Sequence, residues 1–191
     1  MKIFINAGHG GADCGAVSKN NFLEKDITRT IAGFLGNMLI QKGYNIEYFQ
    51  QEKSVNEVAQ AENKSNSNLF ISLHCNSVEN EKANGVEVLY YEGSGIGKDL
   101  ATKMSKCISE YMEIKNRGAK PRKDLRVLSG TKAPAILIEL AFLSNKDEEQ
   151  LLINEPYSFA SGIMKGLYEW QKWLSGTKMK KLEYFLIEYQ R

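Results

Sequence analysis

The chain contains two histidines, and each one follows or ends a short apolar segment of high β-propensity. His9 comes just after residues 2–7, and His74 ends the run 69–74. Segments of this composition are typical of strands buried on both faces. Ligands of open α/β sheets bind at the carboxyl ends of parallel strands. We therefore expect both imidazoles at one edge of a sheet, where they could bind a metal or exchange protons.

A glutamate is expected beside the two histidines. A helix is predicted at about residues 22–42, because apolar residues recur there at helical spacing: Ile27, Ile31, Phe34, Leu35, Met38 and Leu39. Continuing this stripe towards the N-terminus leads to Glu24, in the first turn and on the side that packs against the sheet. Because the helix follows the first strand, Glu24 is expected at the same edge as His9 and His74.

The local pattern around Glu24 has a second interpretation. Glu24 can form a variant of the capping box with Asn21, and an acidic residue in the first turn of a helix also interacts well with the helix dipole. Two imidazoles and one carboxylate, however, form a common catalytic zinc site that leaves the fourth position to water. The pattern predicts a metal site formed by His9, Glu24 and His74, with the capping role of Glu24 as the alternative.

A second glutamate, Glu139, interrupts the apolar run 135–143. A buried carboxylate without a partner is costly, so it needs a cation, hydrogen bonds or a raised pKa. A place near a metal-bound water would supply such a partner. An ion pair with Arg117, Lys120 or Arg122 from the preceding segment explains the same residue equally well.

Strand-like and helix-like segments alternate along the chain, which predicts an α/β fold. The predicted strands are residues 2–7, 44–49, 69–74, 85–91, 125–128 and 135–140. The predicted helices are about 22–42, 54–66, 95–114 and 146–173. We expect one sheet of about six mostly parallel strands, flanked by helices on both faces. The segment 85–91 alternates most clearly between polar and apolar residues, so it is the candidate for an edge strand.

Size and composition predict one globular domain. The chain has 191 residues and a net charge of +2, which gives no argument for nucleic acid as a partner. No apolar run reaches membrane-spanning length, so membrane insertion is not expected. Three cysteines without CxxC spacing are expected as reduced thiols. We assign residues 1–174 to the domain and 175–191 to a short linker and tail.

Four short motifs together resemble a known family. They are Asn6-Ala7-Gly8-His9-Gly10-Gly11, Glu24, Ser72-Leu73-His74-Cys75-Asn76-Ser77 and Ile138-Glu139-Leu140-Ala141-Phe142-Leu143-Ser144-Asn145. In this order and spacing, they resemble the zinc-dependent N-acetylmuramoyl-L-alanine amidases of the type 3 family, over about residues 1–173. Cys75 departs from the usual pattern, but strand alternation points its side chain away from that of His74.

The resemblance implies a function and a site. It implies that His9, Glu24 and His74 bind one zinc ion per chain and that Glu139 is the catalytic glutamate. It further implies that the substrate and partner is peptidoglycan, cut between N-acetylmuramic acid and L-alanine. A phage endolysin or a bacterial autolysin is the expected setting. The oligomeric state does not follow from the sequence.

Other functions fit parts of the pattern. The chain could be a cell-wall-binding module without activity. His9 in its glycine-rich loop could be the nucleophile of a phosphoryl-transfer enzyme, although the loop matches no phosphate-binding motif and offers no arginine. Cys75 could be the nucleophile of an ordinary hydrolase.

The first residues carry an expectation about localisation. The start, MKIFINAGHG, turns to glycine and histidine too soon for a signal peptide. We therefore expect a protein made in the cytoplasm that reaches the cell wall after release, by lysis, through a pore or within a mother cell.

Overall fold

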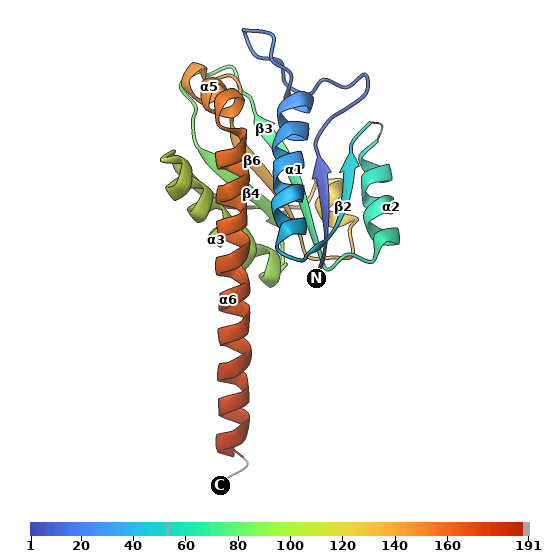
Figure 1. Cartoon of the computed structure of the whole chain (residues 1–191), viewed down its shortest axis with the longest axis vertical. Coiled ribbons are helices and arrows are strands. Elements are labelled where there is room, and N and C mark those ends of the chain that lie inside the picture. The colour runs from blue at the N-terminus through green and yellow to red at the C-terminus, as the bar shows by residue number, and fades with distance from the viewer. Residues whose placement is uncertain (53, 189–191) are drawn as a thin grey trace.

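One mixed sheet forms the centre of the molecule (Figure 1). The computed structural model describes residues 1–52 and 54–188, with residues 177–188 described by their backbone alone. The strands are β1 (Lys2–Ala7), β2 (Asn45–Gln50), β3 (Leu69–Asn76), β4 (Val86–Tyr91), β5 (Asn116–Arg122) and β6 (Ala135–Phe142). Their order is β2-β1-β3-β6-β4-β5, and only the β4–β6 pair is antiparallel. The prediction of a six-stranded, mostly parallel sheet is confirmed.

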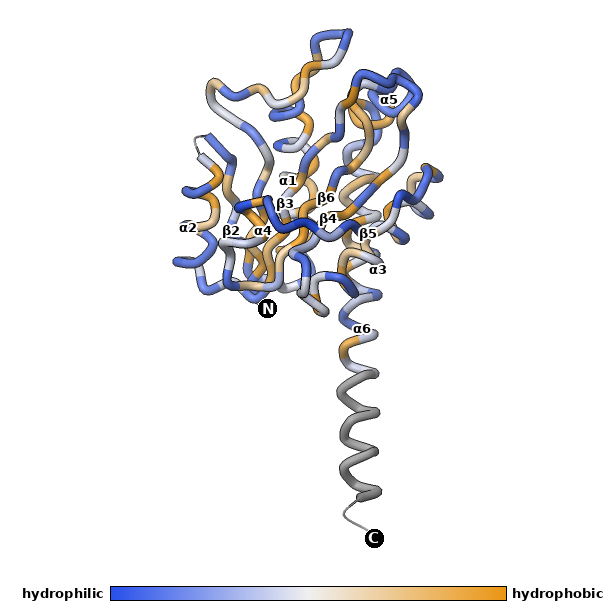
Figure 2. Tube along the Cα trace, turned by 180° about the vertical axis from the view of Figure 1, so that it is seen from behind, coloured by the Kyte–Doolittle hydropathy of each residue, from blue (hydrophilic) through white to orange (hydrophobic). Residues whose placement is uncertain are grey.

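Helices cover both faces of this sheet, as predicted. The helices are α1 (Glu24–Gln41), α2 (Val55–Ser65), α3 (Gly95–Met112), α4 (Arg126–Ser129), α5 (Lys146–Asn154) and α6 (Pro156–Glu188). The larger hydrophobic cluster joins one face of the sheet to α1, α3 and α6. The smaller cluster joins the other face to α2 and α4. Figure 2 shows the apolar residues gathered in the strands and the inner helix faces, with polar residues outside.

Strand alternation decides on which face each side chain lies. In β3, Leu73 and Cys75 both belong to the larger cluster, so His74 between them projects towards the α2 and α4 face. In β6, Ile138 and Leu140 belong to the larger cluster, so Glu139 projects to the same face as His74. Cys75 therefore points away from His74, as the sequence predicted.

Two strand predictions were wrong. The segment predicted as a strand at 125–128 forms the short helix α4, and the strand is instead β5, Asn116–Arg122. The sequence of β5, NRGAKPR, lacks the apolar run that marks a buried strand, which an edge strand does not need. Because β5 pairs with β4, the segment 85–91 is not at the edge of the sheet either.

The last predicted helix, 146–173, is two helices. α5 ends at Asn154 and α6 begins at Pro156, because proline has no N–H to continue the preceding helix but is well suited to the first turn of a new one. The helical backbone of α6 continues through 175–177, where a linker was expected; the domain boundary after residue 174 stays a prediction. Within the described residues, no helix is both long and apolar enough to span a membrane.

Candidate metal centre and active site

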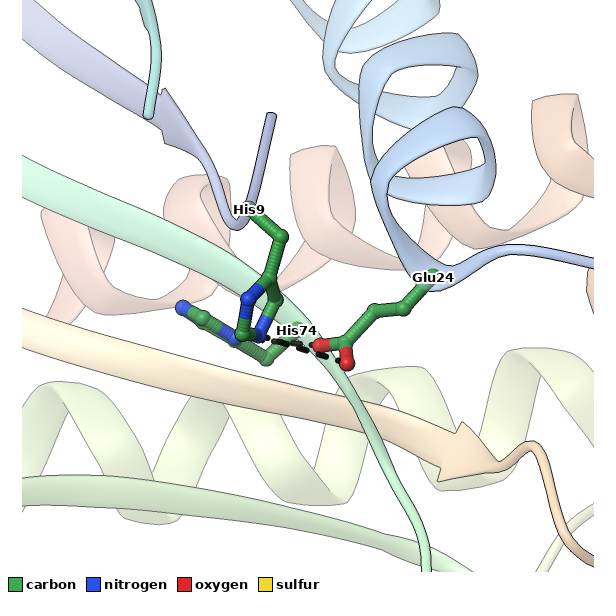
Figure 3. Close-up of side chains that lie close together, drawn as sticks. All are labelled: His9, Glu24 and His74. Atoms are coloured by element: carbon green, nitrogen blue, oxygen red, sulfur yellow. Dashed lines mark hydrogen bonds and ion pairs between the residues drawn. The ribbon is translucent and has the colours of Figure 1, made fainter. Parts of the chain in front are cut away.

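Three side chains from distant parts of the chain meet at the carboxyl edge of β1 and β3 (Figure 3). His9 follows β1, His74 lies near the end of β3, and Glu24 is the first residue of α1. Glu24 Oε2 is 3.3 Å from His9 Nε2, and Glu24 Oε1 is 3.1 Å from His74 Nδ1. The convergence expected from the sequence is therefore present, while the role of these residues as metal ligands stays a prediction.

Glu24 does not cap its helix. Leu23 occupies the N-cap position, and no side chain makes a capping hydrogen bond there. The Glu24 carboxylate instead accepts hydrogen bonds from the backbone N–H groups of Ala16, at 2.8 Å, and Cys75, at 2.9 Å. Only 3% of the residue is exposed. The capping-box interpretation is wrong, and the hydrogen bonds hold the carboxylate between the two imidazoles.

Asp13 orients His9, and sequence analysis missed it. His9 has a left-handed backbone conformation, with φ 60°, which turns the chain back after β1. Its Nδ1 lies 2.9 Å from Asp13 Oδ2, and the other Asp13 oxygen accepts a hydrogen bond from the Gly15 N–H at 3.0 Å. When Nδ1 donates its hydrogen bond to Asp13, Nε2 is the ring atom that faces Glu24 and could bind a metal, as in metal sites where a carboxylate fixes the tautomer of the ligand.

Two glycines leave room for the rings. A Cβ at Gly8 would lie 2.6 Å from both ring nitrogens of His74, and a Cβ at Gly15 would lie 2.6 Å from Glu24 Oε2. Gly15 also has a φ of +65°, which glycine adopts without strain. These glycines therefore have a packing role beside the His–Glu–His cluster.

The electrostatics of the cluster favour a cation. Hydrogen bonding to Glu24 raises the pKa of His9 to about 9. Burial would raise the pKa of Glu24, but hydrogen bonds from His74 and His9 dominate and hold that pKa far below its usual range. Glu24 is thus a buried carboxylate whose charge needs positive neighbours, here a protonated imidazole.

The donor set fits a metal ion such as zinc. Two ligand atoms on one tetrahedral zinc, each about 2.0–2.1 Å from it, lie about 3.4 Å apart. The two Glu24–His contacts, at 3.3 and 3.1 Å, are already close to that separation. All three ligand atoms lie within 4.8 Å of one another, so small side-chain adjustments would complete the site.

Glu139 lies directly beside this cluster. It is paired with His74 on β3 and with Glu87 on β4, so these three residues form a row across the sheet. Its Oε2 is buried and has no hydrogen-bond partner among the described residues. Burial, with contributions from Glu24 and Glu87, raises the pKa of Glu139 to about 7. A carboxyl group with this pKa can accept and return a proton near neutral pH.

The alternative interpretation of Glu139, an ion pair with Arg117, Lys120 or Arg122, is not found within the part of the chain that the structure describes. Arg117 binds Glu87 instead, and Arg122 binds Asp124 through two hydrogen bonds. The cysteine alternative also loses support: Cys75 is only 4% exposed, and burial raises the pKa of its thiol well above the usual range. A reactive cysteine requires a lowered pKa and access, and Cys75 has neither.

The fold and the site are those expected of a metal-dependent hydrolase. The molecule is a single α/β domain with a His–Glu–His cluster suited to a metal and a glutamate suited to proton transfer. Comparison with known proteins identifies the family to which this fold and site belong. The family of N-acetylmuramoyl-L-alanine amidases matches residues 3–169. A putative N-acetylmuramoyl-L-alanine amidase of Buchnera aphidicola is 32% identical, over 82% of this chain and 89% of that protein. This chain belongs to the N-acetylmuramoyl-L-alanine amidase family.

Two further similarities support this assignment. The probable cell wall amidase LytH of Staphylococcus aureus is 30% identical over 78% of this chain, which spans half of LytH. The crystal structure of an N-acetylmuramoyl-L-alanine amidase from Clostridium difficile 630 superimposes with a TM-score of 0.82 at 33% identity. That alignment covers 90% of this chain and 96% of the other. The family is that of the resemblance noted from the sequence.

Proposed function

We propose that this protein is a zinc-dependent amidase that hydrolyses the bond between N-acetylmuramic acid and L-alanine in peptidoglycan. The observation that supports this proposal most strongly is the His9–Glu24–His74 cluster, with Glu139 next to His74 on the same face of the sheet. Three ligands that leave one position open are typical of catalytic rather than structural zinc. Membership of the amidase family supports the choice of bond.

His9, Glu24 and His74 would hold the zinc. When bound, zinc makes water a nucleophile near neutral pH and polarises a carbonyl group. Asp13 keeps the His9 Nδ1 protonated, so that Nε2 is the ligand atom. Glu24 supplies the negative charge, and the N–H groups of Ala16 and Cys75 fix its orientation.

Glu139 would carry the proton through the reaction. It takes one proton from the attacking water as the oxygen forms its bond to the amide carbonyl carbon. It then gives that proton to the nitrogen of L-alanine as the carbon–nitrogen bond breaks, because an amide nitrogen leaves badly unless it is protonated. The products are the muramic acid carboxyl group and a peptide with a new amino terminus. A pKa of about 7 suits a group that must act first as base and then as acid.

Product chemistry tests the proposal. Purified peptidoglycan from several wall types is digested, and new amino-terminal alanine and new reducing sugar ends are assayed in parallel. Chelator-treated and zinc-restored samples run beside the native one. New alanine amines that disappear with the chelator and return with zinc are expected. Reducing ends without new amines would mean a glycosidase and would overturn the proposal.

The alternatives give other results in the same assay. A cell-wall-binding module would sediment with the walls and release neither product, although folded and loaded with zinc. A phosphoryl-transfer enzyme would instead acquire a labelled phosphate on His9. Neither outcome is expected, because the His9–Glu24–His74 cluster and the neighbouring Glu139 are the residues that the proposed chemistry needs.

We further propose that the protein acts on the cell wall as an endolysin or autolysin, after release from the cytoplasm. The wall substrate of the family supports a wall location, and the route of release stays a prediction. Immunoblots of the medium and cells of the producing culture, taken before and during lysis, test it. Release that begins with lysis is expected, whereas steady export from intact cells would contradict it.

A further inference from the structure

An arginine is fixed beside Glu87, the strand neighbour of Glu139, by contacts that the proposed chemistry does not use. Glu87 is the neighbour of Glu139 on the antiparallel strand β4. Its Oε2 accepts a hydrogen bond from Arg117 Nε at 2.7 Å, and its Oε1 accepts one from Asn76 Nδ2 at 3.2 Å. Both Glu87 oxygens are therefore occupied, and Arg117 is held at the end of the row His74, Glu139, Glu87.

A β-bulge turns Arg117 into this position. Val86 pairs with Asn116 but Glu87 pairs with Gly118, so Arg117 is an extra residue in β5. Gly118 has a φ of +82°, which allows the local turn. Bulges are rare between parallel strands, and those near active sites often re-aim a side chain. In the register that holds from Glu87–Gly118 onward, the position before Gly118 would pair with Val86, which belongs to the larger cluster on the other face of the sheet from Glu87.

A second strand irregularity, between β3 and β6, places an aromatic ring against the guanidinium of Arg117. The register of β3 and β6 shifts after His74–Glu139, which brings Phe142 opposite Asn76. The central guanidinium carbon of Arg117 lies 4.8 Å from the centre of the Phe142 ring. An aromatic face and an ion pair together fix the plane of the guanidinium.

The outer end of the guanidinium remains available. The Arg117 side chain is 32% exposed, and among the described residues its two Nη groups donate no hydrogen bond. The other nearby carboxylate, Glu148, already accepts hydrogen bonds from the backbone N–H groups of Gly85 and Phe142. An arginine whose Nε is anchored and whose Nη groups are free presents two donors suited to a carboxylate.

We propose that Arg117 binds the free carboxylate on the second residue of the stem peptide, and that Glu87 is its positioning residue. This inference rests on the proposed amidase function. Neighbouring strands are about 4.8 Å apart, so β4 lies about 10 Å from β3, which carries His74. Beyond the scissile bond, L-alanine and the next residue extend about 7 Å, and a hydrogen bond adds about 3 Å. The second residue carries either a carboxylate or, in amidated walls, a neutral amide.

The test compares two substrates that differ in this one group. Glycan strands with the carboxylate or the amide on the second stem residue are digested by the wild-type protein and by Arg117→Gln, Arg117→Lys, Glu87→Gln and Lys120→Gln. Lys120 is the matched control, because it is an exposed cation on the same strand β5. The rate of release of amino-terminal alanine gives kcat and KM for each combination of protein and substrate.

Wild type and the Lys120→Gln control should prefer the carboxylate substrate by about 10- to 100-fold in kcat/KM, mainly through KM. Arg117→Gln should lose this preference and leave the amide substrate nearly unaffected. Arg117→Lys should keep part of the preference, since it retains the charge but not the planar pair of donors. Glu87→Gln should raise KM for the carboxylate substrate more than for the amide substrate; any change in kcat through the pKa of Glu139 should be the same for both substrates.

Equal cleavage of the two substrates by the wild-type protein would overturn the inference, whatever the variants do. So would an Arg117→Gln protein that is slower on both substrates with the preference unchanged, because that pattern describes a purely structural ion pair. Failure of the amidase function itself looks different: no new amino-terminal alanine appears from intact walls with wild-type protein.

Discussion

At the scale of single residues, the surroundings of Glu24 and Glu139 shift the pKa values of these two glutamates in opposite directions. Glu24 is hydrogen-bonded by two imidazoles and two backbone amides, which hold its pKa far below the usual range. Glu139 has a buried oxygen without a partner and a pKa raised to about 7. A permanently charged carboxylate suits a metal ligand, and a carboxyl group that titrates near neutrality suits proton transfer. The same residue type thus has two different environments in one site, each suited to the role that we propose for it.

Glu139→Gln separates proton transfer from metal binding. The amide cannot exchange the proton, so we expect turnover to fall by about 10²- to 10⁴-fold with zinc content unchanged. Zinc per chain and the rate of alanine release are measured on the same preparation. His74→Ala is the comparison and should lose zinc and activity together. Near-native turnover of Glu139→Gln would rule out the proposed role of Glu139.

Zinc affinity should depend on pH through His9. The metal needs the neutral imidazole, but in the metal-free protein the pKa of His9 is raised to about 9, mainly by Glu24. Below that pKa a proton must leave, so affinity should rise about tenfold per pH unit and level off near pH 9. Competition with a chromophoric chelator between pH 6.5 and 8.5 measures this slope.

Asp13→Asn supplies the control for the pH dependence. Asp13 contributes to the raised pKa of His9, so its loss should move the rise in affinity to lower pH. An affinity that does not change with pH in the wild-type protein would show that His9 is not a ligand or is not protonated in the free protein.

At the scale of strands and helices, the site depends on the order of the strands in the sheet. β3 lies between β1 and β6, so the loop after β1, His74 and Glu139 become neighbours. Gly8 continues the β1–β3 ladder, with its N–H bonded to the Leu73 carbonyl at 2.9 Å, and the His74 ring lies over it. The absent side chain of Gly8 therefore leaves the room that the His74 ring occupies.

Gly8→Ala should displace the His74 ring. The new Cβ would lie 2.6 Å from both ring nitrogens, so the ring must move, and we expect zinc affinity to fall by about 10- to 100-fold. Chelator competition measures the loss, and circular dichroism checks the fold. Gly33→Ala in α1 is the matched control, because its Cβ would meet nothing within 4 Å. Unchanged zinc affinity in Gly8→Ala would contradict the packing argument.

At the scale of the whole molecule, α6 packs on the domain mainly through side chains in its first half, as far as its side chains are described. Its described buried residues on this face end near Trp170: Phe159, Ala160, Ile163, Leu167 and Trp170. Leu174 still packs against the larger cluster. Residues 175–191, predicted as linker and tail, therefore begin where the described core contacts end.

Truncation after Leu174 tests that boundary. The shortened chain should fold and keep its turnover, with a free energy of unfolding within about 0.5 kcal/mol of the full chain. Urea denaturation and alanine release measure the two properties. A deeper truncation that also removes Trp170 should lose about 3–5 kcal/mol, because that side chain is buried. Loss of folding on removal of 175–191 alone would make the tail part of the domain.

The sequence by itself determined the elements and the residues with strong local patterns. Apolar runs predicted most of the strands, and helical periodicity placed Glu24 on the inner side of α1. Two histidines at the ends of such runs, with Glu139 inside a third, were enough to predict which residues would meet. These inferences succeed because hydrophobic periodicity is local, and parallel strands bring their carboxyl ends to one edge.

Only the tertiary structure decided how these residues are supported. β5 is a strand because it pairs with β4, although its own residues lack an apolar run. Asp13 reaches His9 across a turn in which His9 and Gly11 are left-handed, and Arg117 reaches Glu87 from a bulge. Each of these contacts arises from strand pairing or chain reversal between separate segments. A local pattern does not contain that information, so the convergence of His9, Glu24 and His74 was predictable and the residues that orient and surround them were not.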